Sequence, residues 1–183
     1  SGNDLDVSPK SFYIDITTII NNYVLNDEEY YLFGFSFGGF AVNQFLHLTK
    51  NKSVKKVALI GPPLEPINSS LLNPKEFCYQ EISDAQKSGQ LEREGYVLLK
   101  SKNWRISKQF LDECYEYDYK EAIKYLSNRT LLLQGKNDRN VDKDYNERHA
   151  KEYNIQYKEY EASHSLVEVI DEVVLEILKF YNS

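Results

Sequence analysis

The ten residues from Tyr30 to Gly39 constrain the fold of this chain more than any other stretch. An apolar run leads directly into Ser36, and a helical pattern follows at once. The segment Gly34-Phe35-Ser36-Phe37-Gly38 fits Gly-x-Ser-x-Gly, in which a serine occupies a sharp turn between a strand and a helix. Small residues are expected two before and two after the serine, because a Cβ at either flank would collide with the neighbouring strand or helix. Such a turn holds the hydroxyl at a helix start, where backbone N–H groups and the helix dipole stabilise developing negative charge.

The motif alone is short, and a second interpretation exists. A glycine-rich turn between a strand and a helix can also carry a serine that only faces solvent. The flanking pattern favours the nucleophile elbow, because the motif requires a preceding strand and an immediate helix and both patterns are present.

Composition excludes several classes of protein. With 183 residues, 42% hydrophobic and 27% charged, the chain is typical of one globular domain. A net charge of −6 without a long basic run argues against nucleic acid and anionic membranes as partners. No apolar run reaches membrane-spanning length, and the first residues do not resemble a signal peptide. The two cysteines lack metal-site or disulfide spacing, so a cytoplasmic location with free thiols is predicted.

The hydrophobic periodicity alternates between helix and strand at both ends of the chain. Before the middle segment it predicts a helix over 9–26, a strand over 30–35, a helix over 37–50 and a strand over 55–60. After it, the pattern predicts a strand over 130–135, a helix over 143–153, a strand over 155–160 and a helix over 167–181. In the last helix the side chains predicted to face inward are Val167, Ile170, Val174, Ile177, Leu178 and Tyr181. This order predicts an α/β fold with a parallel sheet flanked by helices.

The middle segment does not follow this alternation of helix and strand. Residues 64–128 contain a predicted helix over 75–87, a hairpin of 96–99 against 104–106, and a helix from about 107. The segment is too long for one crossover and too structured for a linker. We interpret it as a cap inserted into a core formed by 1–63 and 129–183; the alternative is a second small domain with its own role.

Three reactive side chains follow the carboxyl ends of three predicted strands: Ser36, Asp138 and His164. In an open parallel sheet these ends share one edge, so residues distant in sequence can meet there. His164 can take the proton of Ser36, and Asp138 can orient the imidazole and stabilise its cation. Asn137 and Asp142 compete with Asp138 for the acid position.

Three segments resemble the elbow, acid and histidine motifs of the α/β-hydrolase superfamily: Gly34–Gly39, Leu133–Val141 and Ser163-His164. Residues Gly135 to Val141 match the acid-loop pattern Gly-x-x-Asp-x-x-Val of that superfamily. The order of the segments is similar to serine esterases of the feruloyl/cinnamoyl-esterase and acylglycerol-lipase type. This resemblance, which covers nearly the whole chain, implies ester hydrolysis through an acyl-enzyme, with the N–H of Phe37 as one oxyanion donor.

One departure from that pattern lies at the beginning of the chain. In the superfamily several strands precede the elbow strand, and a loop after an early strand donates the second oxyanion N–H. Only about thirty residues precede Ser36, without a recognisable strand, so an N-terminally truncated fold is expected. The strand 30–35 would then be an apolar sheet edge that pairs readily. We expect either a homo-oligomer or a missing N-terminal segment to cover this edge.

The predicted function is hydrolysis of a small-molecule carboxylic ester by Ser36, His164 and Asp138, with no metal and no organic cofactor. The aromatic residues Phe35, Tyr96 and Trp104 would suit an apolar or aromatic acyl group, although core packing explains them equally well. Two alternatives remain: a peptidase or acyltransferase that uses the same three residues, and a catalytically impaired hydrolase remnant or binding module.

Overall fold

The computed structural model describes residues 7–24, 28–64, 79–100 and 103–183. The chain divides into two compact units. One, here called the sheet unit, comprises residues 15–65 and 118–183; the other, called the hairpin unit, comprises residues 1–14 and 66–117. Within the described ranges, none of the helices combines the length and the apolar character that crossing a membrane requires.

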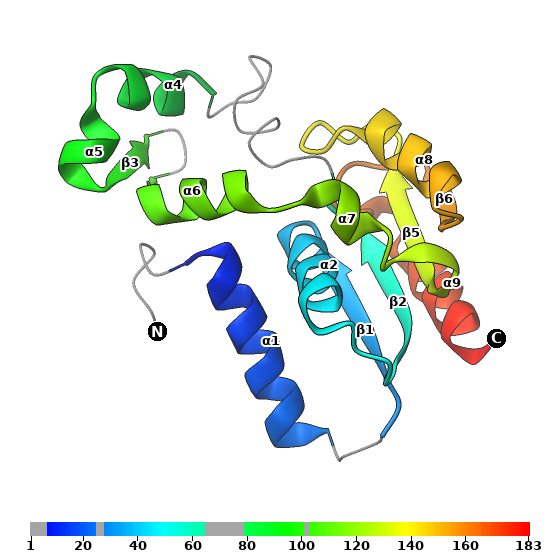
Figure 1. Cartoon of the computed structure of the whole chain (residues 1–183). Helices are drawn as coiled ribbons and strands as arrows, with labels where there is room; N and C mark the ends of the chain where they lie inside the picture. Colours follow the sequence, from blue (N-terminus) through cyan, green and yellow to red (C-terminus); the bar gives the residue numbers. More distant parts are fainter. Residues whose placement is uncertain (1–6, 25–27, 65–78, 101–102) are drawn as a thin grey trace. The chain divides into compact units, whose positions relative to one another are not determined.

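The sheet unit contains a four-stranded sheet in which every pair of neighbours is parallel (Figure 1). Its spatial order is β1 (Tyr30–Phe35), β2 (Val54–Ile60), β5 (Thr130–Gly135) and β6 (Gln156–Tyr160). Two strands, β1 and β5, have the bounds that the sequence predicts. Since all four strands run in one direction, their carboxyl ends meet at the same edge.

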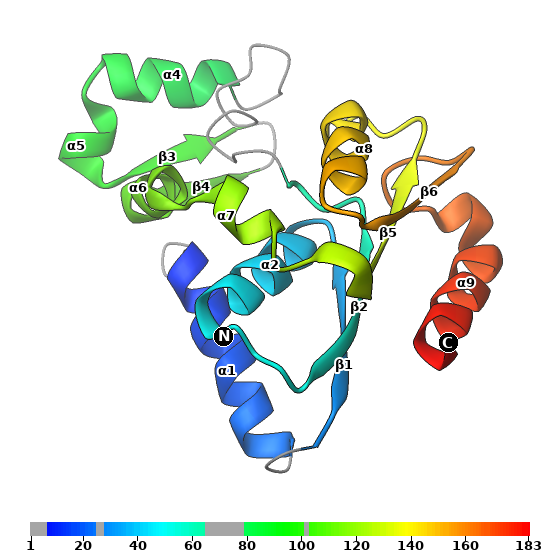
Figure 2. The ribbon, with the colours of Figure 1, turned by 45° about the vertical axis from the view of Figure 1, so that its right-hand side comes forward.

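The two central strands form the core of this unit. Ala58 and Leu59 of β2 and Leu132 and Leu133 of β5 are fully buried, as expected for parallel strands covered on both faces. In Figure 2, α2 (Phe37–Thr49) and α8 (Lys143–Glu152) lie on one side of the sheet and α9 (Ile170–Asn182) on the other. The short helices α7 (Tyr119–Ile123) and η2 (Ser127–Arg129) lead into β5.

The face that α9 presents to the sheet differs from the prediction. Val173 and Phe180 are buried and Ile177 packs against the same core, whereas most of the side chains predicted to face inward are exposed: Val167, Ile170, Val174 and Leu178. A second, exposed apolar stripe therefore runs along α9. Because the helix is apolar on two sides, periodicity alone does not identify the side that meets the sheet.

Strand β1 lies at the edge of the sheet in the described part of the chain. Its exposed side chains alternate with positions that are half-buried or, at Gly34, buried, and Tyr31 and Phe33 are 52% and 53% exposed. The ring of Tyr181 stacks on Tyr31 at a centroid distance of 4.8 Å, and its hydroxyl donates to the Leu32 carbonyl at 2.7 Å. Burial raises the pKa of Tyr181 to about 12, so this hydroxyl keeps its proton at neutral pH.

The hairpin unit contains the predicted hairpin, in which β3 (Tyr96–Leu99) pairs antiparallel with β4 (Trp104–Ser107). Its helices are α4 (Tyr79–Lys87), α5 (Gln90–Glu94) and α6 (Lys108–Glu116). Ser107 caps α6 by accepting a hydrogen bond from the Phe110 N–H. Residues 75–78 of the predicted helix lie outside the described residues. The role of segment 64–128 as an inserted cap remains a prediction.

The first helix, α1, spans Pro9–Tyr23. Ser8 precedes it, and its hydroxyl accepts a hydrogen bond from the Ser11 N–H at 3.2 Å while the Ser8 N–H donates to the Ser11 hydroxyl. The Lys10 N–H donates to the carboxylate of Glu113. The first turn of α1 therefore begins where the Ser-Pro pattern predicts.

Candidate active site

Ser36 lies on the sharp turn between β1 and α2. Its backbone has φ 49° and ψ −120°, a conformation that a residue with a side chain rarely adopts. The Ser36 N–H donates to the Ile60 carbonyl at 2.8 Å, which ties the turn to the end of β2. Ser36 occupies the N-cap position of α2, yet its hydroxyl makes no capping hydrogen bond. The hydroxyl is thus available to a partner across the sheet edge.

The glycines around Ser36 confirm one expectation from the motif and correct another. A Cβ on Gly34 would lie 2.7 Å from the Gly39 Cα, so a glycine is needed there. A Cβ on Gly38 would meet no atom within 4 Å, so the collision expected at this flank is wrong. Gly39 is the tight position instead, because its Cβ would lie 2.7 Å from the Pro62 Cβ. The glycine at which α2 packs closely against the loop after β2 is therefore one residue later than the motif predicts.

A matched pair of alanine variants tests this difference. We expect Gly34→Ala to lower the free energy of unfolding by about 1–3 kcal/mol or more, because the added methyl group overlaps backbone atoms. Gly38→Ala has open space within a helix, and alanine favours helix, so it should change stability by less than about 1 kcal/mol, toward higher stability. Urea denaturation of both variants measures the difference; equal losses would contradict the assignment.

His164 joins Ser36 and Asp138 in one line of hydrogen bonds. Its Nε2 lies 2.8 Å from the Ser36 Oγ, and its Nδ1 lies 2.7 Å from the Asp138 Oδ2. The Asp138 carboxylate accepts only, so Nδ1 donates to it and Nε2 is left to accept from the serine hydroxyl. The His164 side chain is 15% exposed and that of Asp138 is fully buried. The structure therefore brings together the three side chains that the sequence singles out.

Backbone hydrogen bonds connect the loop after β5, which carries Asp138, to the loop after β6, which carries His164. We call them the acid loop and the histidine loop. The Lys136 N–H donates to the Tyr160 carbonyl at 2.9 Å, and the Asn137 N–H donates to the Ala162 carbonyl at 3.1 Å. A Cβ on Gly135 would lie 2.2 Å from the Ser163 carbonyl oxygen. This close approach requires a glycine and continues the β5–β6 pairing beyond the last strand residues.

Gly61, directly after β2, lies against the candidate site although its sequence pattern does not indicate such a position. Its φ is +49°, and a Cβ there would lie 3.0 Å from the His164 Nδ1 and 3.3 Å from the Asp138 Oδ2. The absence of a side chain thus leaves room for the hydrogen bond between the imidazole and the carboxylate. The Gly-Pro-Pro sequence after β2 was the available signal, but it indicates only a turn.

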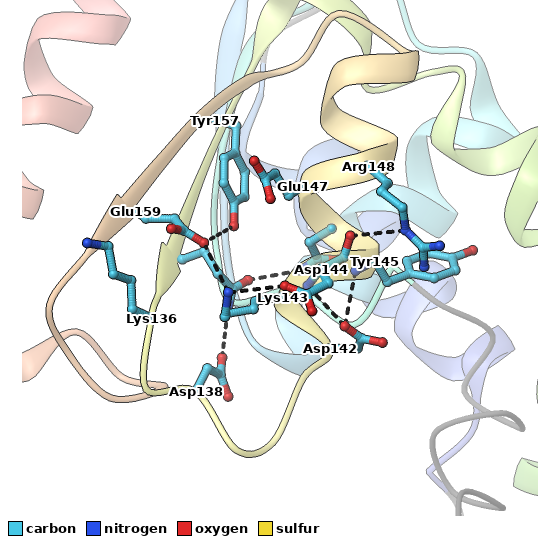
Figure 3. A network of polar contacts seen from close by, with 12 residues as sticks. Lys136, Asp138, Asp142, Lys143, Asp144, Tyr145, Glu147, Arg148, Tyr157 and Glu159 are labelled. Carbon is cyan, nitrogen blue, oxygen red and sulfur yellow. Dashed lines mark hydrogen bonds and ion pairs between the residues drawn. The ribbon is translucent and has the colours of Figure 1, made fainter.

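The choice among the acidic candidates follows from what each carboxylate does. The Asp138 Oδ1 accepts from the N–H groups of Asn140 and Val141, which leaves Oδ2 directed at His164. Asp142 instead caps α8 by accepting from the N–H groups of Asp144 and Tyr145. Figure 3 shows Asp138 on the loop and Asp142 at the start of the helix.

A hollow of about 530 Å³ opens beside His164. Its other lining residues are polar and come from the acid and histidine loops: Asn137, Arg139, Asn140, Ser163 and Ser165.

Phe35, predicted to bind substrate, lies with its ring 5.3 Å from the His164 ring and is 42% exposed. Phe37 is the first residue of α2, and its ring packs against Phe40.

The two remaining residues predicted to contact substrate belong to the hairpin unit. Tyr96 begins β3, and the guanidinium of Arg105 lies 5.8 Å from the centre of its ring. Trp104 begins β4 and is 40% exposed. The contact of both residues with substrate remains a prediction.

Comparison with known proteins rests on structure alone, since no family model and no curated sequence matches this chain. The monoacylglycerol lipase of Paleococcus ferrophilus superimposes with a TM-score of 0.61 at 18% identity, over 97% of this chain and 77% of that one. Est1E from Butyrivibrio proteoclasticus gives a TM-score of 0.69 at 14% identity, over 97% and 73%. An alpha/beta fold family hydrolase from Bacillus anthracis gives 0.66 at 17% identity, over 98% and 76%.

The chain has the α/β-hydrolase fold. Nearly all of it aligns with each of these proteins, while about a quarter of each of them has no counterpart here. Within this fold, Ser36 lies between β1 and α2, and Asp138 and His164 lie on the loops after β5 and β6. The predicted resemblance and fold class are therefore confirmed.

Proposed function

We propose that this protein is a serine hydrolase that cleaves carboxylic esters through an acyl-enzyme. The observation that carries the proposal is the unbroken line from the Ser36 Oγ through both nitrogens of His164 to the Asp138 Oδ2. A serine hydroxyl is a weak nucleophile until a neighbouring base takes its proton, and this arrangement supplies both the base and a carboxylate that orients it.

The reaction follows from these atoms. As the Ser36 Oγ attacks the ester carbonyl carbon, its proton moves to the His164 Nε2, and the buried carboxylate of Asp138 stabilises the resulting imidazolium. The backbone N–H of Phe37 supplies a hydrogen bond to the oxyanion. Collapse of the tetrahedral intermediate breaks the bond to the alcohol oxygen, which takes the proton from His164. Water then attacks the acyl-enzyme with His164 as base, which releases the acid and restores Ser36.

The ester substrate class is supported by two considerations. Structures with this fold include a monoacylglycerol lipase and the esterase domain of a Rhodothermus marinus protein. Phe35 places an exposed aromatic ring beside His164, where it would contact an apolar or aromatic acyl group. We propose a small-molecule ester with such a group as the substrate.

Covalent labelling combined with a substrate panel tests the proposal. A fluorophosphonate probe forms a bond from the serine oxygen to phosphorus with release of fluoride, and mass spectrometry of the adduct identifies the serine. Esters, thioesters and peptides presented in parallel separate an esterase from an acyltransferase or a peptidase. A chain that is neither labelled nor turns over any ester would be a binding module or an impaired remnant instead.

We further propose that a second copy of the chain pairs with the open edge of β1. The strand contains no charged residue and no proline, the usual devices that prevent pairing at an edge. Tyr31 and Phe33 are exposed there, and α9 continues the apolar surface because Tyr181 stacks on Tyr31. Antiparallel pairing about a twofold axis would bury the same patch on both copies.

Sedimentation velocity tests this pairing. We expect the chain to sediment as a dimer at concentrations of tens of micromolar, and Phe33→Lys to sediment as a monomer because it places a charge on the edge. Leu48→Lys is the control, since Leu48 is similarly exposed (50%) but lies on α2. A monomeric unsubstituted chain, or dissociation by both variants alike, would contradict the proposal.

A further inference from the structure

Behind the carboxylate of Asp138 lies a buried pair of amide side chains that the reaction described above does not use. The Gln134 Nε2 donates to the Asp138 Oδ2 at 2.6 Å, on the side chain that also accepts from His164. The Asn146 Nδ2 donates to the Gln134 Oε1 at 2.9 Å and to the Pro62 carbonyl at 2.8 Å. Gln134 and Asn146 are both fully buried.

A backbone carbonyl at one end of this series of hydrogen bonds fixes which amide atom donates and which accepts in each of them. The Pro62 carbonyl can only accept, so Asn146 must turn its NH₂ group toward it. The second hydrogen of that group then reaches the Gln134 Oε1, and the Gln134 NH₂ is left to face Asp138. The Pro62 carbonyl therefore orients Asn146 of α8, and Asn146 orients Gln134 of β5. As a result the NH₂ group of Gln134, and not its oxygen, faces the Asp138 carboxylate.

The buried amide pair lowers stability, and the packing between α8 and β5 does not require amide side chains. The Asn146 Oδ1 is buried without a hydrogen-bond partner in the described part of the chain, and an unsatisfied buried oxygen is unfavourable. An apolar side chain would fill the space between α8 and β5 without that cost. What the amide pair supplies, and an apolar pair would not, is an oriented donor to Asp138.

We propose that Gln134 is a positioning residue for the candidate active site and that Asn146 orients it. With Gln134 in place, the Asp138 Oδ2 accepts from two side chains and Oδ1 from two backbone N–H groups. The carboxylate is therefore held in one plane, with Oδ2 directed at the His164 Nδ1.

The effect of this inference on turnover depends on the proposed function, so the test includes a measurement that does not. A ring proton shared between a histidine nitrogen and a carboxylate oxygen resonates far downfield in the proton NMR spectrum. In Gln134→Leu, the Asp138 Oδ2 loses the donor that fixes its orientation. The geometry of its hydrogen bond with His164 then changes, so this resonance should move or disappear. No turnover is needed to observe it.

Thr130→Val is the matched control. Thr130 is a fully buried residue of the same strand, β5, and its hydroxyl donates to the Leu126 carbonyl at 2.7 Å, away from Asp138. Its loss removes a buried hydrogen bond at the other end of the strand. We expect both variants to lose stability while only Gln134→Leu changes the histidine resonance.

In the turnover measurement we expect Gln134→Leu to lower kcat about 10–100-fold, the usual effect of one hydrogen bond to a charged group, with KM changed less than about two-fold. Gln134→Leu/Asn146→Leu should lower kcat no further than Gln134→Leu, because Asn146 acts only through Gln134. An unchanged resonance in folded Gln134→Leu, or a kcat equal to that of Thr130→Val, would overturn the positioning role. A moved resonance in a chain that hydrolyses no ester would leave that role standing and refute the proposed function instead.

Discussion

Ser36→Ala is expected to abolish covalent labelling by a fluorophosphonate and to lower kcat by roughly 10⁶-fold, the order found for other triad serines. The reason is chemical: without Oγ there is no atom to attack the carbonyl carbon, and the His164 Nε2 loses the hydroxyl that lies 2.8 Å away. The fold should survive, because the hydroxyl makes no capping hydrogen bond to α2. We therefore expect a melting temperature within about 2 °C of the unsubstituted protein.

Ser165→Ala provides the control for this experiment. Ser165 lines the hollow beside His164, and its side chain is not one of the partners in the hydrogen bonds that join Ser36, His164 and Asp138. Its substitution should leave the labelling rate within a few-fold of the original. Labelling that persists in Ser36→Ala at another serine would refute the nucleophile assignment.

Asp138→Asn is expected to lower kcat by about 10⁴-fold, as the loss of a triad carboxylate does elsewhere. An asparagine is nearly the same size, but its amide is uncharged and does not hold the proton of the imidazole on Nδ1. His164 would then present a proton rather than a lone pair to the Ser36 Oγ. Steady-state kinetics with the best ester of the panel measures the loss.

Asp142→Asn is the matched variant, four residues further along the same loop. Asp142 accepts from two N–H groups at the start of α8, and asparagine caps helices about as well as aspartate. We expect kcat within a few-fold and a change in stability of a few tenths of a kcal/mol. Should Asp142→Asn remove activity while Asp138→Asn retains it, the assignment of the acid would be wrong.

The parts of this structure that the sequence predicts are those determined by local chemistry. The strands β1 and β5 are short apolar runs closed by a serine turn and a glycine, and their bounds match the prediction. The meeting of Ser36, Asp138 and His164 also follows from one rule, namely that the carboxyl ends of parallel strands share an edge.

What the sequence does not predict depends on contacts between distant segments. The tight glycine of the elbow is Gly39 rather than Gly38 because of Pro62, a residue of another loop. In the sequence, Gln134 is only one more residue of a predicted strand. Its hydrogen bond with Asn146, which also donates to the Pro62 carbonyl, is seen only in the structure. The inward face of α9 was ambiguous for a related reason, since the helix is apolar on two sides and only the sheet selects one of them.

The hydrogen bond between Ser36 and His164 joins residues separated by 128 positions in the chain. Ser36 follows the first strand of the described sheet, while His164 follows the last. During synthesis Ser36 therefore leaves the ribosome long before His164, and the hydrogen bond between them forms only once β6 has joined β5. Closing so long a loop is entropically costly. Under the proposed function, reactivity would therefore be among the last properties that the chain acquires as it folds.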